Sequence, residues 1–366
     1  MRSRDRFYMG LAIELAGKAQ NPGPNPYVGA VLVKNNRVVG KGYHHGAGQP
    51  HAEVNAIQDA GLQAQNSTLY INLEPCAHFG RTPPCTQALI RAGVKKVVIG
   101  MRDPNPLVNG RGIAELKKAG IEVIEGILEE EARRLNEKYI KYITKKMPFV
   151  LLKSAMSLDG KIATCTGESK WISSKESRRY VRQLRSRFDA VLVGINTVLK
   201  DNPGLNTGPE FKLQGSKVPY KIIVDSSLRI PLRAKVLKNP GQVIVATTGK
   251  APKSRIKKLK DSGVRVLVVK EKNGRVDLKA LMKELAKLEI SSVLIEGGGE
   301  INASAIESGI VDKILFFIAP RIIGGRYAKT PVEGMGIKRI LDAIPLTHMT
   351  VSLCGRDVMV EGYPEK

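Results

Sequence analysis

The segment TLYINLEPCAHFGRTPPC, residues 68–85, together with the HAE triplet at 51–53, decides the interpretation of this chain. TLYINLE is rich in β-branched and apolar residues, which predicts a strand that ends just before Cys76. HAEVNAIQDAG predicts a helix that ends at Gly61. Chemistry on an α/β sheet commonly lies at the ends of its strands, so Cys76 stands at a suitable place for it.

One histidine and two cysteines in these segments form a candidate zinc site. His51, Cys76 and Cys85 offer borderline-soft ligand atoms of the kind that suits Zn²⁺. Three protein ligands leave a fourth position open for water, which is typical of catalytic zinc. Water on such a metal loses a proton near neutral pH and becomes a nucleophile. Glu53 lies two residues from His51 and can pass that proton to a leaving nitrogen.

The pattern is that of the zinc deaminases, H-x-E…P-C-x-x-C, except in the spacing of the cysteines. Eight residues separate Cys76 from Cys85 instead of two. The longer loop argues against tRNA and DNA deaminases. It also adds His78 and Arg81, which either face a substrate or lie at the loop tip.

The rest of the first 150 residues alternates between helix and strand patterns. Helices are expected over 5–19, 86–92 and 112–119, and strands over 28–34, 37–43, 95–101 and 121–126. Strands separated by single helices indicate an α/β layer with substantial parallel pairing. Residues 129–146 predict one charged helix, acidic at its start and basic at its end, that Pro148 terminates. We expect the domain boundary at 146–148.

The second half restarts the alternation and contains a glycine-rich turn. Strands are expected over 149–157, 189–194, 220–225, 242–248, 264–269, 292–296 and 312–319. The sequence EGGGEIN, residues 296–302, follows one of them and opens a helix. It is either a phosphate site or a plain glycine-rich turn. Because it is not G-x-G-x-x-G, a Rossmann fingerprint is not supported.

Composition excludes several classes of protein. The 366 residues are 42% hydrophobic and 25% charged, which excludes disorder, collagen-like repetition and a membrane protein. A net charge of +25 suggests nucleic acid or small phosphorylated ligands, or else a solvated surface. Four cysteines and no secretory signal indicate a cytoplasmic protein, and Cys165 and Cys354 are expected to be packed free thiols.

Further motifs carry a resemblance to a known family. P-C-x-H-x-G-[RK]-T-P-P-C, with N-P-x-V-G-A at 25–30 and M-R-D-P-N-P at 101–106, resembles the bacterial bifunctional riboflavin-biosynthesis deaminase–reductases over essentially the whole chain. The resemblance implies an α/β protein with a cytidine-deaminase-like three-layer domain over 1–147 and a dihydrofolate-reductase-like domain over 148–366. It implies hydrolytic deamination of 2,5-diamino-6-(5-phosphoribosylamino)pyrimidin-4(3H)-one, then NADPH-dependent reduction of the ribosyl group to ribityl.

The resemblance also assigns residues of the first half. It implies a zinc site made of His51, Cys76 and Cys85, with Glu53 as the catalytic proton shuttle. The implied substrate contacts are Asn25, His44 and Arg81. By its sequence context alone, Asn25 is equally a turn residue between two prolines.

In the second half the resemblance rests on SLDGKIA at 157–163, GESKWIS at 167–173 and GINTVLKDNP at 194–203. The positions matching the family's NADPH site are Ala155, Trp171, Thr197, Asp201, Ser226, Gly298, Gly299, Glu300, Ile301, Asn302, Ala303 and Ser304. Those matching its substrate site are Ser169, Arg185, Leu205 and Glu296. The side chain of Trp171, the single tryptophan, offers a flat apolar face for the cofactor or else belongs to a core or interface. Arg185 offers a fork of donors for a phosphate.

One position departs from the family. An arginine often stands three residues after the leucine at 205, where this chain has Gly208. Another cation must then serve the phosphate, and Lys212 is a nearby candidate. Asp201 and Glu296 are the carboxylates available for proton handling in the reduction.

The expected partner is a small phosphoribosylated pyrimidine, with no nucleic acid and no membrane, and the expected assembly is a homo-oligomer, dimer or tetramer. Two alternatives stay open. One is a polynucleotide (tRNA-type) deaminase with an appended nucleotide-binding domain, although aromatic residues are only 5% of the chain. The other is a regulatory module that binds nucleotides without catalysis.

Overall fold

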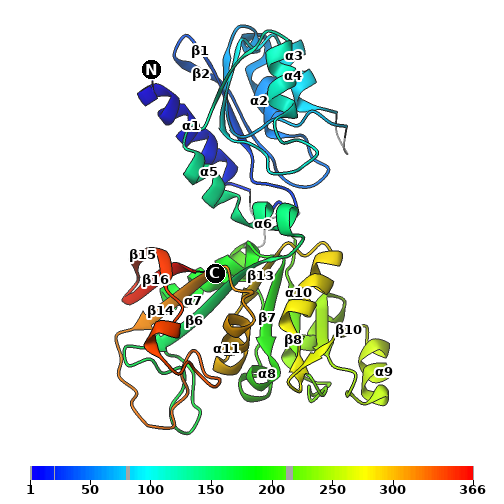
Figure 1. Cartoon of the computed structure of the whole chain (residues 1–366), viewed down its shortest axis with the longest axis vertical. Helices are drawn as coiled ribbons and strands as arrows, with labels where there is room; N and C mark the ends of the chain where they lie inside the picture. Colours follow the sequence, from blue (N-terminus) through cyan, green and yellow to red (C-terminus); the bar gives the residue numbers. More distant parts are fainter. Residues whose placement is uncertain (1, 20, 80–82, 212–216, 366) are drawn as a thin grey trace. The chain divides into compact units, whose positions relative to one another are not determined.

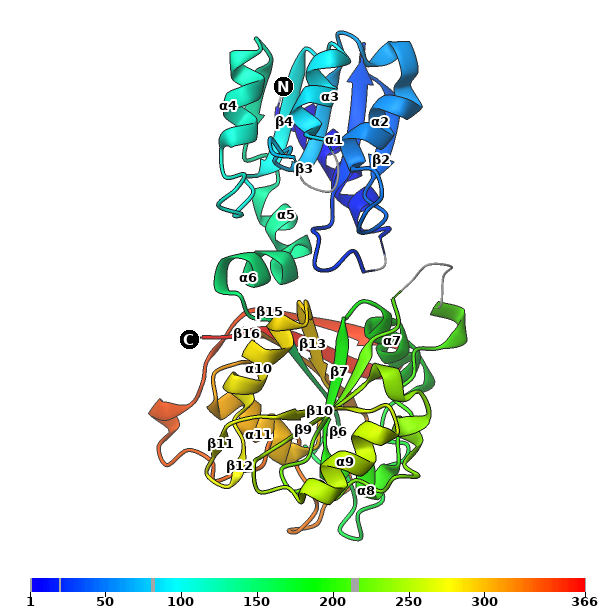
Figure 2. The same ribbon diagram turned by 90° about the vertical axis from the view of Figure 1, so that its right-hand side faces the viewer.

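The computed structural model describes residues 2–19, 21–79, 83–211 and 217–365, and it divides into two compact units, Met1–Lys146 and Met147–Lys366 (Figure 1). Each unit has its own central sheet with helices on both faces (Figure 2). None of the helices in the described part of the chain combines the length and apolar character that crossing a membrane requires.

The N-terminal unit is built on a five-stranded sheet of order β2-β1-β3-β4-β5. The pairs β1–β2 and β1–β3 are antiparallel, whereas β3–β4 and β4–β5 are parallel. Its helices and strands are α1 (Arg2–Ala16), β1 (Gly29–Lys34), β2 (Arg37–Tyr43), α2 (Ala52–Ala60), β3 (Thr68–Leu73), α3 (Cys85–Arg91), β4 (Lys96–Met101), α4 (Arg111–Lys118), β5 (Glu122–Glu125), α5 (Glu129–Leu135) and α6 (Glu137–Lys145).

Alternating side chains of this sheet enter two different cores, which makes the unit three-layered. On one face Leu69 packs with Ala56 of α2 and Leu116 of α4. On the other face the next residue, Tyr70, packs with Met9 of α1. Because successive side chains of a strand point to opposite faces, both faces of β3 need cover, and the helices supply it.

Two glycines of β2 set the position of α2. A Cβ at Gly40 would lie 2.3 Å from the carbonyl oxygen of Ala56, and one at Gly42 would lie 2.3 Å from that of Ala52. Any larger residue would push the helix away from the sheet. The close contact holds the first turn of α2, which carries Glu53, against the end of the hairpin.

The C-terminal unit is built on a nine-stranded sheet of order β10-β9-β8-β7-β13-β6-β14-β16-β15, parallel except at β14–β16–β15. Its helices are α7 (Lys175–Ser186), α8 (Ile195–Asp201), α9 (Lys253–Asp261), α10 (Leu278–Lys287) and α11 (Gly299–Glu307). Its strands are β6 (Phe149–Ser157), β7 (Ala190–Gly194), β8 (Tyr220–Val224), β9 (Val243–Thr247), β10 (Arg265–Val268), β13 (Ser292–Ile295), β14 (Lys313–Ala319), β15 (Leu346–Cys354) and β16 (Asp357–Pro364), with a separate small hairpin of β11 (Glu271–Lys272) and β12 (Arg275–Val276).

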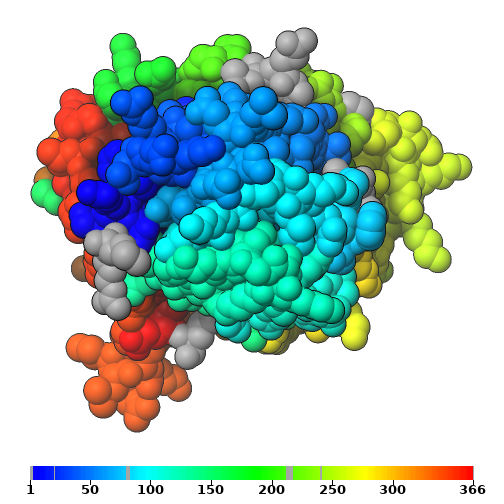
Figure 3. All heavy atoms as spheres, turned by 90° about the horizontal axis from the view of Figure 1, so that it is seen from above, coloured from blue at the N-terminus to red at the C-terminus, as the bar shows by residue number. Residues whose placement is uncertain are grey.

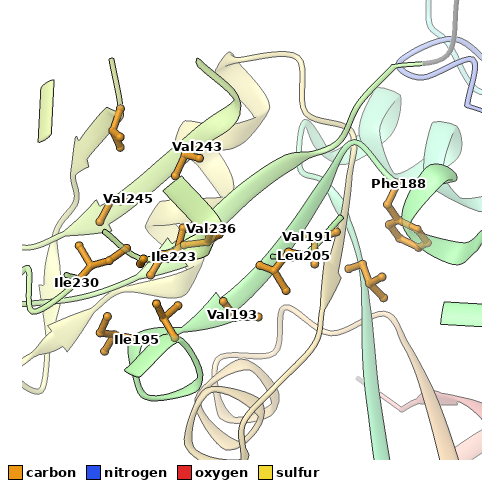
Figure 4. Packing of buried hydrophobic residues seen from close by; sticks show 14 of the residues in the cluster. Phe188, Val191, Val193, Ile195, Leu205, Ile223, Ile230, Val236, Val243 and Val245 are labelled. Carbon is orange, nitrogen blue, oxygen red and sulfur yellow. The ribbon is translucent and has the colours of Figure 1, made fainter. Parts of the chain in front are cut away.

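Neighbouring residues of β7 again enter opposite cores. Val193 packs with Val181 of α7, in the cluster where apolar side chains of β7, β8 and β9 meet (Figure 4). Leu192 packs with Leu281 of α10 and Ala305 of α11. The second core therefore fixes α11 on this face of the sheet.

The α/β class and the parallel pairing agree with the sequence expectation, and three local predictions need correction. The helix expected over 129–146 is two helices, because Asn136 leaves helical geometry with φ −103° and ψ 14°. The helix expected over 5–19 is α1, which already begins at Arg2 and ends at Ala16. Strands β15 and β16 were not predicted, since neither LTHMTVSLC nor DVMVEGYP contains a long continuous apolar run.

Candidate active sites

The three predicted metal ligands meet at one point of the N-terminal unit. His51 precedes α2, Cys76 follows β3, and Cys85 is the first residue of α3. The Nδ1 atom of His51 lies 3.0 Å from Sγ of Cys85 and 3.6 Å from Sγ of Cys76. All three ligand atoms lie within 4.8 Å of one another. One imidazole nitrogen and two sulfurs at this spacing fit the ligand set of a tetrahedral zinc ion with one position left open.

The surroundings of Cys76 favour its thiolate, the form that binds metal. Hydrogen bonds from the Cys85 thiol and from His51 lower the pKa of the Cys76 thiol well below its ordinary value. The backbone N–H of Cys85 also donates to this sulfur at 3.4 Å. The site is therefore prepared for a cation before one binds.

Glu53 lies in the first turn of α2 with only 3% of its surface exposed. Burial, and then the charge on Cys76, raise the pKa of this carboxyl to about 7. A carboxyl that gains and loses a proton near neutral pH suits general acid–base work. The chain therefore places a buried carboxyl with a raised pKa directly beside the candidate metal ligands.

Two of the predicted substrate residues lie together next to this centre. The Nδ2 atom of Asn25 is 3.1 Å from Nε2 of His44, whose Nδ1 is 3.3 Å from the carbonyl oxygen of Pro50. This pattern fits a neutral imidazole that donates to Pro50 and accepts from Asn25. Burial lowers the pKa of His44, which keeps it neutral. Its ring centroid lies 5.3 Å from that of His51.

The loop between the two cysteines is described only in part. Arg81, predicted to contact substrate, lies outside the described residues. The Nδ1 atom of His78 is buried and has no hydrogen-bond partner among the described residues.

Sequence reasoning missed Glu74, which anchors the loop after β4. Its buried carboxylate accepts backbone N–H groups from residues 103, 110, 112 and 113 at 3.0–3.3 Å. The same loop carries Asp103, where burial raises the carboxyl pKa to about 6. Glu74 stands two residues before Cys76, so the anchor ties this loop to the metal site. A carboxylate at the end of an apolar strand was the available signal.

In the C-terminal unit a cavity of about 830 Å³ opens at the carboxyl ends of β7, β8 and β13. The N-terminus of α11 forms part of its wall, and the N–H of Gly298 donates to Oγ1 of Thr197 at 3.0 Å. A Cβ on Gly299 would lie 2.5 Å from the carbonyl oxygen of Thr330, so only glycine fits there. The predicted residues that line this cavity are Ser169, Thr197, Asp201, Ser226, Gly298, Gly299, Glu300, Ile301 and Ser304.

Four residues predicted to contact the cofactor do not line the cavity. Asn302 and Ala303 are buried in α11, and Ala155 packs on the core at β6. The Trp171 side chain is 61% exposed, and the guanidinium carbon of Arg178 lies 4.6 Å from the centroid of its ring. An exposed aromatic ring with one face covered by a cation leaves its other face available.

The predicted substrate residues Arg185 and Glu296 form a two-pronged ion pair. Nε and Nη2 of Arg185 donate to the two carboxylate oxygens at 2.6 and 2.8 Å. Burial alone disfavours the charge on Glu296, but Arg185 and then Lys153 outweigh it and lower the pKa of the carboxyl. Lys153, a half-buried lysine of β6, was missed by sequence reasoning, although a lysine inside the apolar run FVLLKSAMS was a visible signal.

The other two predicted substrate residues are Ser169 and Leu205. The hydroxyl of Ser169 donates to Asp201 at 2.9 Å. Leu205 is buried with φ 51°, and Nη1 of Arg185 donates to the carbonyl oxygen of the next residue at 2.7 Å. At Gly208 a Cβ would lie 2.4 Å from the carboxylate of Glu210. Lys212, the candidate substitute cation, lies outside the described residues.

Comparisons with known proteins cover both units. Residues 2–101 match the model of the cytidine and deoxycytidylate deaminase zinc-binding region, and residues 148–360 match that of the RibD C-terminal domain. The riboflavin biosynthesis protein RibD of Aquifex aeolicus is 46% identical over 98% of both chains, and that of Actinobacillus pleuropneumoniae is 45% identical over 98% of this chain and 94% of its own.

Solved structures agree with this result. RibD of Acinetobacter baumannii (form 1) superimposes with a TM-score of 0.90 at 38% identity and covers 100% of both chains. A diaminohydroxyphosphoribosylaminopyrimidine deaminase/5-amino-6-(5-phosphoribosylamino)uracil reductase of Thermotoga maritima gives a TM-score of 0.86 at 36% identity, over 100% of this chain and 99% of that one. The chain therefore belongs to the RibD family of riboflavin biosynthesis, whose members join a zinc-dependent deaminase to an NADPH-dependent reductase.

Proposed function

We propose that the N-terminal unit deaminates 2,5-diamino-6-(5-phosphoribosylamino)pyrimidin-4(3H)-one by hydrolysis, and that the C-terminal unit reduces the ribosyl group of the product to ribityl. The observation that carries the first step is the convergence of His51, Cys76, Cys85 and Glu53. The second step is supported by the cavity at the N-terminus of α11 and by the Arg185–Glu296 pair.

In the deamination, His51, Cys76 and Cys85 hold the zinc ion. The metal, when bound, supplies the Lewis acid that activates water. Glu53 takes a proton from that water and returns it to the departing amino nitrogen, which its pKa of about 7 allows in both directions. Asn25 and His44 bind the pyrimidine edge, because they present an amide and a neutral imidazole beside the metal ligands.

In the reduction, the chain has to align two ligands and exclude water. NADPH supplies the hydride that the sugar carbon C1′ accepts. The backbone N–H groups at the start of α11 receive a cofactor phosphate. Arg185 and Lys153 bind the sugar phosphate end, and Lys153 takes the place of the arginine that the family often has at 208. Ser169 and Asp201 orient the sugar hydroxyls.

The two steps are tested separately on the full chain. Ammonia release is measured with the diaminopyrimidine substrate, and NADPH oxidation is measured with the deaminated substrate. Both activities support the proposal. Ammonia release from RNA or single-stranded DNA, without release from the small substrate, would instead support a polynucleotide deaminase. NADPH binding without either turnover would support a regulatory module.

We further propose that two copies of the chain associate through β15. This strand is at the edge of the nine-stranded sheet, and Met349, Val351 and Leu353 alternate along it with 53–76% of their surfaces exposed. The nearby segment 335–341, orange in Figure 2 and Figure 3, projects from the unit and exposes Met335 and Leu341 almost completely. An uncovered apolar edge strand is suited to pair with its own copy around a twofold axis.

The assembly is tested by light scattering of the purified chain. The mass of a dimer or tetramer is expected for the unmodified protein, and a monomer mass for Val351→Glu combined with Leu353→Glu. A monomer before substitution, or an unchanged oligomer after it, would disprove this interface.

The free state of all four cysteines supports a cytoplasmic location, which fractionation of the producing cells tests.

A further inference from the structure

The residue that breaks the helix expected over 129–146 makes a long-range contact. Asn136 lies between α5 and α6 and is completely buried. An asparagine at a helix start normally caps it by accepting a backbone N–H, yet the Asn136 side chain caps neither helix. Its Oδ1 accepts the N–H of Tyr27 at 2.7 Å, and its Nδ2 donates to the carbonyl oxygen of Tyr27 at 3.0 Å.

A second buried amide holds the same segment from the sheet. Oδ1 of Asn72, on β3, accepts the N–H of Gly29 at 2.8 Å, and its Nδ2 donates to the carbonyl oxygen of Tyr27 at 2.9 Å. The segment 22–26 contains three prolines, which have no N–H to donate. Strand pairing of this stretch begins only at Gly29, so side-chain amides replace a neighbouring strand there.

The clamped segment carries part of the deaminase site. Asn25 stands two residues before Tyr27, and its Nδ2 reaches Nε2 of His44 at 3.1 Å. The N–H of His44 donates to the carbonyl oxygen of Val28 at 2.9 Å, so the segment also places this imidazole. A change at Asn136 therefore reaches both side chains through one short piece of backbone.

We propose that Asn136 is a positioning residue of the deaminase substrate site, which holds Asn25 and His44 in place through the backbone of Tyr27. The proposal rests on the function proposed above for that site. It explains why the helix breaks at Asn136: the side chain forms two buried hydrogen bonds across 109 positions of sequence instead of continuing or capping a helix. Buried polar groups need such partners, so the contact is specific in geometry.

The test measures both activities of the full chain in Asn136→Ala. The kcat/KM of deamination is expected to fall roughly tenfold or more, mainly through KM, because a misplaced contact weakens substrate binding. Zinc content and reductase kcat/KM are expected to stay at the values of the unmodified protein. Tyr70→Phe is the matched control, since it removes another buried hydrogen bond of the same unit, to Asp5. It is expected to lower the melting temperature without changing KM.

A double-mutant cycle with Asn25→Ala separates positioning from general loosening. If Asn136 acts through Asn25 and its neighbour His44, Asn136→Ala adds less than its single effect once Asn25 is alanine. If the fold-change of the double variant equals the product of the two single fold-changes, the proposal is overturned. An unchanged KM in Asn136→Ala would also overturn it.

The isosteric Asn136→Asp serves if the alanine variant does not fold. It keeps the acceptor for Tyr27 N–H and places a second oxygen against the Tyr27 carbonyl, so a raised KM is again expected and an unchanged KM overturns the proposal. Absence of deamination in the unmodified, zinc-loaded chain would refute the proposed function itself. Failure of the Asn136 proposal is therefore distinguishable from failure of the proposed deaminase function.

Discussion

Arg185 and Glu296 face each other as a parallel fork, with Nε···Oε1 at 2.6 Å and Nη2···Oε2 at 2.8 Å. The two residues come from α7 and from the end of β13, 111 positions apart. Only 17% of the arginine side chain and 8% of the glutamate side chain are exposed. A buried pair of this geometry contributes little net stability, but it fixes both side chains in one orientation.

Arg185→Lys tests this orientation. Lysine keeps the charge and loses the planar fork, so it cannot hold Glu296 and the carbonyl at 206 together. Reductase kcat/KM is expected to fall roughly 10-fold to 100-fold, the range for lost hydrogen bonds between charged groups. Steady-state NADPH oxidation measures it, and deamination by the same sample is the control. Full reductase activity in this variant would show that the fork is unnecessary.

Lys153→Met tests the phosphate contact proposed for Lys153. Burial lowers the pKa of Lys153, with Glu296 opposing and Arg185 adding to the effect. Methionine keeps much of the volume and removes the charge, so the fold is expected to survive. We expect a reductase KM for the phosphorylated substrate raised about tenfold or more, the cost of one charged hydrogen bond. An unchanged KM would exclude Lys153 from the phosphate site.

Glu53→Gln tests the proton transfer proposed for Glu53 in the deamination. Glutamine keeps the shape of the side chain and cannot accept the proton, so deamination is expected to fall roughly 10²-fold to 10⁴-fold. Zinc content, measured by atomic absorption, and reduction of the supplied deaminated substrate are expected to be unchanged. Loss of both activities in a folded sample would contradict the separation of the two sites.

Removal of zinc should affect only the N-terminal unit. Because the ligands come from the residue before α2, the segment after β3 and the first residue of α3, a bound metal stabilises their arrangement. Chelation is expected to abolish deamination and to lower the melting temperature of that unit, while NADPH oxidation persists. Restoring zinc should recover both properties. A reductase that loses activity on chelation would disprove the prediction.

The hydrogen bonds of the Asp159 carboxylate predict that the stability of the C-terminal unit depends on pH. Its carboxylate accepts from Ser157 Oγ and from the N–H groups of Ile323 and Gly324, and these bonds lower its pKa to about 2. Because the folded-state pKa lies below the ordinary value of 3.8, the stabilisation is complete above about pH 4 and is lost as the pH falls toward about 2.

The comparison is with Asp159→Asn, whose side chain does not titrate. Its melting temperature is expected to lie below that of the unmodified protein at pH 6, and the difference is expected to shrink as the pH falls below about 4. Calorimetry across this range measures both proteins. A difference that stays constant with pH would show that the charge on Asp159 contributes nothing.

The sequence predicted the α/β class, most strands and the family, because these depend on local patterns. The alternation along TLYINLE and FVLLKSAMS marks buried strands wherever they lie in the fold. The His51, Cys76 and Cys85 pattern names a metal by ligand chemistry alone. Strands β15 and β16 escaped prediction because most of β15 is exposed and neither strand contains a long continuous apolar run.

Other features depend on contacts between distant segments. Asn136 lies in a run of good helix formers, so the sequence predicts a helix there. The structure instead pairs its side-chain amide with the backbone of Tyr27. The sequence predicts Glu74 only as the end of a strand. In the structure four backbone N–H groups of another loop donate to its carboxylate. Trp171, expected to face the cofactor, stands outside the cavity wall with Arg178 on its ring.

The sequence by itself therefore determined which chemistry this protein can perform, since ligand types and strand patterns are properties of neighbouring residues. Only the tertiary structure decided which groups hold that chemistry in place. Hydrogen bonds such as Asn136 to Tyr27 and ion pairs such as Arg185 to Glu296 join residues more than a hundred positions apart. Their partners are chosen by packing, and a buried polar group must take whichever partner the fold brings to it.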